Sequence, residues 1–239
     1  MNRIECVWEH NGSDTILYAS NFPGAYTRGA DLNEALSKMQ REVQAFTKWS
    51  GESEFDYPDM HIVQDYPCSL LVRDADSDVM FLSEEGIVSE GEYRKLKAMA
   101  LKSALDFQML FDSVPDKRAM LAPKRETFYG EVPASAEEMY LHTKNVNAYY
   151  FGEIGVDADN EGAILECRRR GFDLLESRQE YLDNTVIDGS YDERWSLRKL
   201  LRRFIWHDRI HAKAMYRGAV RLFGADNIED PFFFSDLVK

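Results

Sequence analysis

Two histidines lie one helical turn apart near the end of the chain, in the segment WSLRKLLRRFIWHDRIHAKAMYRGAVRLFG at residues 195–224. At 3.6 residues per turn, His207 and His211 project from the same face of a helix and are close enough to bind one ion together. Apolar residues share this face, so both imidazoles are expected in the interior, where each ring nitrogen needs a partner. That partner is either a metal ion or an ordinary hydrogen bond of the core.

The helix that carries this pair is predicted over about residues 192–223, with Gly224 at its C-terminal end. The interior stripe consists of Leu200, Arg203, Phe204, His207, Ile210, His211, Ala214 and Gly218. Four basic residues point the other way, namely Arg198, Arg202, Arg209 and Lys213. The pattern is that of a helix with one apolar and one polar side.

Composition favours a soluble, cytoplasmic protein of two modest domains, predicted over residues 1–86 and 87–239. Hydrophobic residues make up 44% of the 239 residues and aromatic residues 13%, which is enough to build real cores. The sequence contains no run of about 20 apolar residues, which is the length that a membrane span requires. The first residues also lack the apolar core of a signal peptide. Cys6, Cys68 and Cys167 are odd in number and far apart, so we expect them to be reduced and structural.

Negative charge is concentrated in the first part of the chain. Residues 1–88 contain 16 acidic and 6 basic side chains, whereas residues 89–239 contain 26 acidic and 23 basic ones. An acidic surface repels phosphate backbones, so nucleic-acid binding is disfavoured. A basic protein is the partner that suits the first domain by charge.

The first domain is predicted to be an α+β module, an antiparallel sheet with one helix. Strand-like alternation is found at residues 4–8 and 16–19 on either side of a turn, and a brief extended segment follows at residues 25–27. A helix is expected to run to about residue 49. Further strands are predicted at residues 60–63, 69–73 and 79–82.

A motif precedes this helix and resembles the HicB-type fold. The family pattern is F-P-(G)-x-x-(T)-x-G-x-(T/S)-x-E-E-A, and the matching residues are Phe22, Pro23, Gly24, Thr27, Gly29, Glu34 and Ala35. Ala30 and Asp31 replace the usual Thr or Ser, and Asp31 is able to serve as the N-cap. The resemblance implies a small α+β module that, in antitoxins, binds a small basic toxin. The DNA-binding tail of those antitoxins does not follow here.

From residue 89 onward the apolar period becomes helical, and helices are predicted over residues 89–113, 135–153, 160–184 and 192–223. Three of them are preceded by capping-box pairs, which are Ser89 with Glu92, Ser135 with Glu138, and Ser190 with Glu193. A long connection at residues 115–133 suggests a crossover. The second domain is therefore predicted to be an all-α four-helix bundle.

His142 lies in the middle of the second predicted helix and supplies a third ligand if that helix packs against the last one. Three neutral imidazoles and a water make an open site of the kind found in catalytic metal centres. Imidazole suits zinc or nickel better than magnesium. The two remaining histidines, His10 and His61, belong to the first domain and are expected to be structural or exposed.

These histidines resemble those of the DinB family, whose signature is one histidine in the second helix and a His-x-x-x-His pair in the last. His142, His207 and His211 match all three positions, within a likeness that covers about residues 90–224. The neighbouring phrases that also fit are Trp195-Ser196-Leu197-Arg198-Lys199, Trp206-His207-Asp208 and Asn147-Ala148-Tyr149-Tyr150. The resemblance implies a bound divalent metal. Characterised relatives use a low-molecular-weight thiol for transfer or isomerisation, and many have no assigned reaction.

Four further residues are candidates for the surroundings of the metal. Arg203, one turn before the histidine pair, is placed either to hold a carboxylate of a thiol or substrate or to form a salt bridge inside the bundle. Glu138 and Asn145 flank His142 and are candidates for orienting its ring, although capping already explains Glu138. Tyr149 is more simply explained by core packing than as an acid.

Two alternatives to this interpretation of the basic and histidine residues are disfavoured. The histidine pair also has the zincin spacing His-Glu-x-x-His, but Asp208 replaces the general-base glutamate and is one methylene shorter. No further ligand follows on a nearby helix, so a protease is not expected. The three arginines at residues 168–170 point in three directions of a helix and are expected to be a solvated face.

Two functions of different class follow from the sequence. The first is a metal-dependent enzyme, a thiol S-transferase or a hydrolase acting on a small molecule. The second is a non-catalytic binding or regulatory protein, in which the acidic module recruits a protein partner and the metal is structural. The apolar tail DPFFF at residues 230–234 is expected either to pack back on a domain or to form a homodimer contact.

Overall fold

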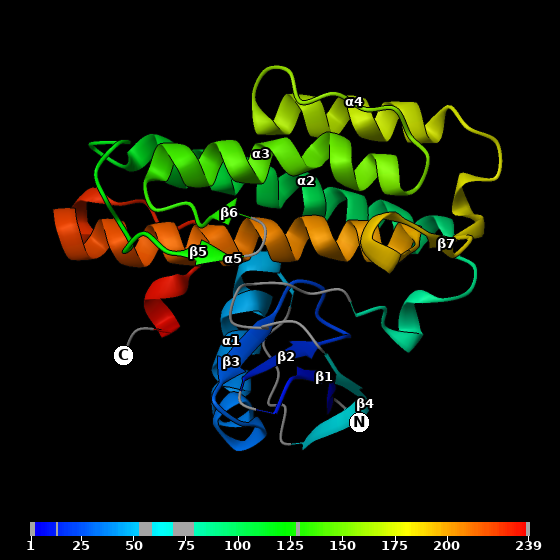
Figure 1. The fold of residues 1–239 in the computed structure, drawn as a ribbon, viewed down its shortest axis with the longest axis horizontal. Coiled ribbons are helices and arrows are strands. Elements are labelled where there is room, and N and C mark those ends of the chain that lie inside the picture. The colour runs from blue at the N-terminus through cyan, green and yellow to red at the C-terminus, as the bar shows by residue number, and fades with distance from the viewer. Residues whose placement is uncertain (1–2, 13, 53–58, 69–78, 128–129, 238–239) are drawn as a thin grey trace.

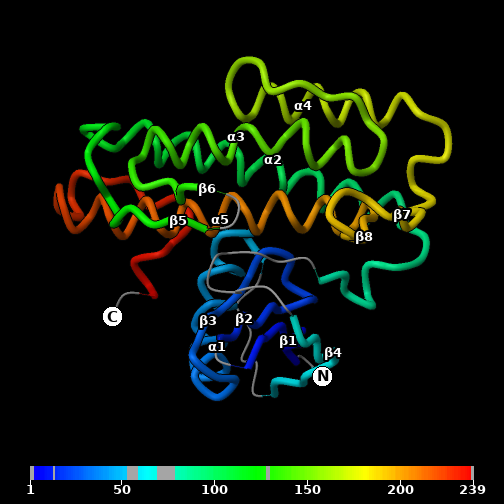
Figure 2. Tube along the Cα trace, viewed as in Figure 1, coloured from blue at the N-terminus to red at the C-terminus, as the bar shows by residue number. Residues whose placement is uncertain are grey.

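A computed structural model describes residues 3–12, 14–52, 59–68, 79–127 and 130–237. A small α+β module lies against one side of a set of long helices, which run side by side along the longest axis of the molecule (Figure 1). The Cα trace shows the same arrangement, with α5 between the module and the other long helices (Figure 2). The expected fold class, α+β followed by helices, is therefore observed.

The module consists of β1 (Arg3–His10), β2 (Thr15–Ala19), β3 (Tyr26–Gly29), α1 (Leu32–Ser50) and β4 (Asp59–Pro67). The four strands form one sheet in the order β3-β2-β1-β4. β1 pairs with β2 and β2 with β3 in antiparallel fashion, as a chain of short turns requires.

The prediction of an antiparallel sheet is wrong, because β4 pairs with β1 in parallel and makes the sheet mixed. The physical reason is that α1 crosses the sheet between β3 and β4 and returns the chain to the same end, so that both strands run in one direction. The strand predicted at residues 69–73 lies outside the described residues. The one predicted at residues 79–82 does not form, and a 3₁₀ turn occupies Leu82–Glu84.

Local sequence explains where α1 begins and which side it buries. Asp31 is extended, and its carboxylate accepts a hydrogen bond from the Glu34 amide at 2.9 Å, as expected of an N-cap. The residues of α1 that contact the sheet recur at helical spacing: Ala35, Met39, Val43 and Phe46. They pack on the face of the sheet that carries Ile4, Cys6, Leu17 and Ala19.

The opposite face of the sheet packs on the long helix α5 (Leu197–Phe223). The aromatic rings of Tyr18 and Tyr26 lie 6.2 and 6.3 Å from that of Trp206. Backbone approach is close as well, because a Cβ on Gly24 would lie 2.5 Å from the Ile205 side chain, and Gly24 has a φ of +103°. The glycine of the FPG segment thus allows the module to seat directly on the helix.

The second part of the chain contains α2 (Glu90–Ser113), α3 (Ala136–Glu153), α4 (Ile164–Glu176) and α5, which pack together in pairs. Two short antiparallel pairs accompany them, β5 (Glu126–Thr127) with β6 (Gly130–Glu131) and β7 (Ile187–Asp188) with β8 (Arg194–Trp195). The N-caps predicted at Ser89 and Ser135 are confirmed, and Ser135 forms a full capping box.

The capping box predicted at Ser190 for the start of the last helix is wrong. Ser190 lies in a 3₁₀ turn, and α5 begins later, with Ser196 as its N-cap. Tyr191 and Asp192 in that turn have a φ of +60°, which no helix continues through. The third helix is also shorter than predicted, since α4 covers 13 residues.

The polar side of α5 is not a solvent face, because the module covers it. Arg202 forms a buried ion pair with Glu84, and its guanidinium also stacks over the ring of Phe81 at 3.8 Å. Glu42 of α1 accepts from Arg209 at 3.0 Å and from Lys213 at 2.7 Å. A charge can leave water only with a partner, so these carboxylates are the groups that make burial of α5 on both sides possible.

The arginine run at residues 168–170 is likewise not a uniform solvated face. Arg168 is completely buried and forms a bidentate pair with Asp208 of α5, whose carboxylate also accepts from the Ser103 hydroxyl. The apolar tail packs back on the protein, with the ring of Phe232 stacked on Trp49 at 5.6 Å.

Among the described residues, no helix is long and apolar enough to span a bilayer. All three cysteines are free and buried, in agreement with the expected structural role.

Replacing Glu42 with glutamine tests the contact between module and helix. Glu42→Gln leaves Arg209 and Lys213 without a counter-charge in a buried site, so the free energy of unfolding should fall by about 3–5 kcal/mol, measured by urea denaturation. Arg118→Ala, which removes an exposed pair with Glu137, should leave the midpoint nearly unchanged. Equal midpoints for the two variants would contradict the role given to Glu42.

Candidate metal centre

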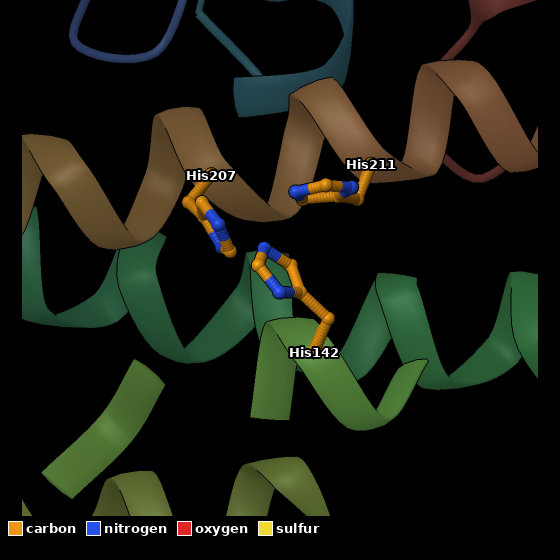
Figure 3. A group of neighbouring side chains, drawn as sticks. All are labelled: His142, His207 and His211. Atoms are coloured by element: carbon orange, nitrogen blue, oxygen red, sulfur yellow. The ribbon is translucent and has the colours of Figure 1, made fainter. Parts of the chain in front are cut away.

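Three imidazoles meet between α3 and α5. His142 comes from α3, His207 and His211 come from successive turns of α5, and the rings point into one space (Figure 3). One nitrogen from each lies within 4.8 Å of the other two. The ring centroids are 4.5 to 5.1 Å apart. The convergence predicted from helical spacing and from the packing of two helices is therefore present.

Packing of α3 fixes the position of His142. The capping box at Ser135 defines where the helix begins. Asn147 links the C-terminal half of the helix to the segment that follows it. The Asn147 amide donates to the carbonyl oxygens of Asp159 and Cys167, at 2.8 and 3.2 Å. One turn further on, the Tyr150 ring packs 5.8 Å from His207 and so joins the two helices beside the site.

The site has a buried end and an exposed end. His207 is 7% exposed, His211 is half-buried and His142 is exposed. Desolvation by neighbouring protein atoms lowers the pKa of His142 even though the residue is exposed, and burial takes the pKa of His207 and His211 well below the usual range. After burial, the largest causes of the lowered pKa of His207 are electrostatic effects of His211 and His142. For His211 they are electrostatic effects of His142 and Arg28. The cluster is therefore neutral at pH 7, which is the state that binds a metal.

The donor set fits a divalent transition metal. The Nδ1 atom of His207 is buried without a hydrogen-bond partner, whereas a core histidine would normally have one. Metal–imidazole bonds of about 2.0–2.1 Å place tetrahedral ligands roughly 3.4 Å apart, so an inward movement of each ring by about 1 Å would close the site. Zinc and nickel both accept imidazole.

Arg203 has the second of its two predicted roles. Its Nη1 lies 3.6 Å from a carboxylate oxygen of Glu193, and its guanidinium packs over the rings of Tyr150 and Trp195. Glu193 also binds Lys199 at 2.8 Å, whose pKa burial lowers to about 8. Arg203 is thus part of an internal ion-pair group beside the histidines.

The other flanking residues do not bind the imidazoles. Glu138 accepts from the backbone amides of Ala134 and Ser135 at 2.8 and 3.1 Å, and these bonds lower its pKa. Asn145 is exposed on α3. The Tyr149 ring is half-buried, 6.0 Å from that of Trp195, and burial raises the pKa of its hydroxyl, which therefore stays protonated at pH 7.

Three further residues weighed in the sequence take no part in the centre. Asp208, at the position of the zincin glutamate, points to Arg168 and Ser103 and cannot serve as a general base. His10 stacks on Trp8 at 3.9 Å and contacts Asp65 at 2.9 Å. His61 is exposed on β4.

A separate cavity of about 250 Å³ lies between the module and the bundle, away from the histidines. Its carboxylates already have cationic partners, which are Lys95 for Glu52, Arg202 for Glu84 and Arg198 for Glu92. Because these charges are already paired, we assign the cavity a structural role. The histidine cluster is therefore the candidate reactive site.

Arg28 is the neighbour of this site that sequence reasoning missed. It lies in β3, far from the histidines in sequence, and its charge acts on His211. No local pattern could have indicated it, because the packing of the module on α5 is what brings it near.

Comparison with known proteins leaves the site to be judged on its geometry. No family model matches the chain, and searches of curated proteins and of solved structures give no match either.

Removal of one imidazole should abolish stoichiometric metal binding. His142→Ala, His207→Ala and His211→Ala, purified without a histidine tag and dialysed against zinc, should each bind far less than one equivalent by elemental analysis. His61→Ala removes an exposed histidine outside the cluster and should bind as the parent does. Full zinc content in all three cluster variants would contradict the assignment.

The lowered pKa values predict how metal affinity depends on pH. Protons compete for an imidazole only near or below its pKa, and burial places the pKa of His207 and His211 well below 6.5. Zinc affinity should therefore change little from pH 8 to pH 6.5 and fall only at lower pH, measured by competition with a chromophoric chelator. A steep loss centred between pH 6.5 and 7 would show that the rings titrate as exposed histidines do.

Proposed function

We propose that this protein is a metal-dependent enzyme in which His142, His207 and His211 hold one divalent ion, zinc or nickel, for transfer of a thiol or for hydrolysis of a small molecule. The observation that supports the proposal is the convergence of three neutral imidazoles from two helices. The DinB resemblance of residues 90–224 suggests a low-molecular-weight thiol as the co-substrate.

Unequal exposure of the three rings supports a catalytic rather than a sealed site. His207 is buried while His142 is exposed, so a small molecule could approach from the His142 side. Three protein ligands leave a fourth position for water or a thiol. A metal held by the three histidines would lower the pKa of a water or thiol bound to it and would supply a nucleophile near neutral pH.

Arg203 and Tyr149 form a wall beside the centre, since both lie next to Tyr150, whose ring packs on His207. Arg203 and Tyr149 lie on the side of the cluster toward Glu193, where Arg203 is held by its ion pair. The protonated Tyr149 hydroxyl is a hydrogen-bond donor beside this wall. The charge of Arg203 adds to burial in lowering the pKa of His207 and so favours its neutral form.

A second candidate is a binding protein, supported by the exposed edge of the module. β4 is at the end of the sheet, with one side unpaired in the described structure, and Asp59 and Asp65 on it are exposed. An edge strand of this kind can accept a strand from a partner. A basic protein suits its charge, and the metal would then be structural.

Cobalt substitution distinguishes an open metal centre from a sealed one. Adding 2-mercaptoethanol to the Co²⁺-loaded protein should produce a thiolate-to-cobalt charge-transfer band in the near ultraviolet, because a thiol can replace the water at the fourth position. The band should be absent from His207→Ala and present in His61→Ala. A Co²⁺ spectrum that thiols leave unchanged would favour the structural role.

A further inference from the structure

Arg28 lies on the sheet face that packs on α5, further along β3 than the aromatic contact made by Tyr26. Tyr18 and Tyr26 are directly opposite in the β2–β3 register, and both rings contact Trp206. Side chains alternate along a strand, so Arg28, two residues after Tyr26 in β3, projects from the same face. The guanidinium is therefore directed toward α5 from the edge of the sheet.

Two donor atoms of Arg28 lack acceptors. Its Nε and Nη2 atoms are shielded from solvent and have no hydrogen-bond partner, and no carboxylate of the described residues pairs with it. Buried nitrogens without an acceptor also occur on Arg168 and Arg209, but each of those guanidinium groups has a carboxylate partner, Asp208 and Glu42 respectively. A shielded guanidinium with unused donors is costly unless a ligand supplies the acceptor.

Position relates Arg28 to the histidine cluster. Ile210, adjacent in sequence to His211, packs into the same apolar cluster as Tyr26. Ala214 lies on α5 between the side that contacts the module and the side that carries His211, and it is exposed. Solvent therefore reaches the helix between the two.

We propose that Arg28 binds the carboxylate of the small molecule that occupies the open position of the metal, so that the ligand class is a carboxylate-bearing thiol or substrate. The inference rests on the proposed metal function and deepens it. A guanidinium forms two parallel hydrogen bonds to a carboxylate, which fixes orientation as well as charge. The α+β module would then complete the ligand site of the helical part.

Two thiols of equal chain length test this inference on the full-length protein loaded with Co²⁺. The probes are 3-mercaptopropionate, which has a carboxylate, and 3-mercapto-1-propanol, which has a neutral hydroxyl. Each is titrated while the thiolate-to-cobalt band is recorded. The parent should bind the carboxylate thiol more tightly, and Arg28→Gln should weaken that binding roughly 10- to 100-fold, the effect of one charge-assisted pair. Binding of the neutral thiol should not change.

Arg217→Gln is the matched control, because Arg217 is an exposed arginine of α5, and both thiols should bind it as they bind the parent. Equal binding of the carboxylate thiol by Arg28→Gln and the parent contradicts the inference while leaving the metal function intact. Failure of the parent to bind Co²⁺ contradicts both.

The unfolding temperature and Co²⁺ affinity of Arg28→Gln show whether it is folded. If either falls, the titration is repeated with Arg28→Lys. This variant keeps the positive charge but cannot form two parallel hydrogen bonds to a carboxylate. A selective loss for the carboxylate thiol supports the inference, and unchanged selectivity overturns it.

Discussion

Every ionised side chain of α5 between residues 199 and 213 is buried and has a partner of opposite charge. The pairs are Lys199 and Arg203 with Glu193, Arg202 with Glu84, Asp208 with Arg168, and Arg209 and Lys213 with Glu42. Removing such charges from water is tolerated only when the partner is held in place. The helix that carries two metal ligands can therefore occupy the centre of the molecule only when the module and the bundle are both assembled around it.

This constraint links the two parts of the chain to the site. The carboxylates of Glu42 and Glu84 hold the module on one side of α5. Helices α2 and α3 pack on the other side, and Arg168 of α4 reaches Asp208 there. The imidazoles lie between these layers, where burial keeps them neutral. The same packing brings Arg28 from the opposite end of the sequence toward His211. The site is thus a product of tertiary assembly as well as of the His-x-x-x-His spacing.

Local rules predicted much of the fold. Asp31, Ser89 and Ser135 are the N-caps that side-chain chemistry indicates, and the period of the apolar residues locates the long helices. Helical spacing was likewise sufficient to place His207 and His211 together on one face of α5. In each of these cases the information is contained within a few residues of sequence or within one helix face.

What could not be predicted depends on long-range packing. A basic stripe on α5 is indistinguishable in sequence from a solvated face until Glu42 and Glu84 are known to lie against it. Arg168 is buried for the same reason, through Asp208. The parallel pairing of β4 follows from the path of α1 rather than from strand residues, and Ser190 has the capping spacing but precedes a turn with positive φ.

X-ray absorption at the zinc edge, on tag-free protein loaded with one equivalent of zinc, tests the central claim most directly. The account predicts three imidazole nitrogens and one further light atom at about 2.0–2.1 Å, with that light atom replaced by sulfur when a thiol is added. A spectrum with one imidazole or none, or with four protein ligands that a thiol cannot displace, would contradict an open three-histidine centre.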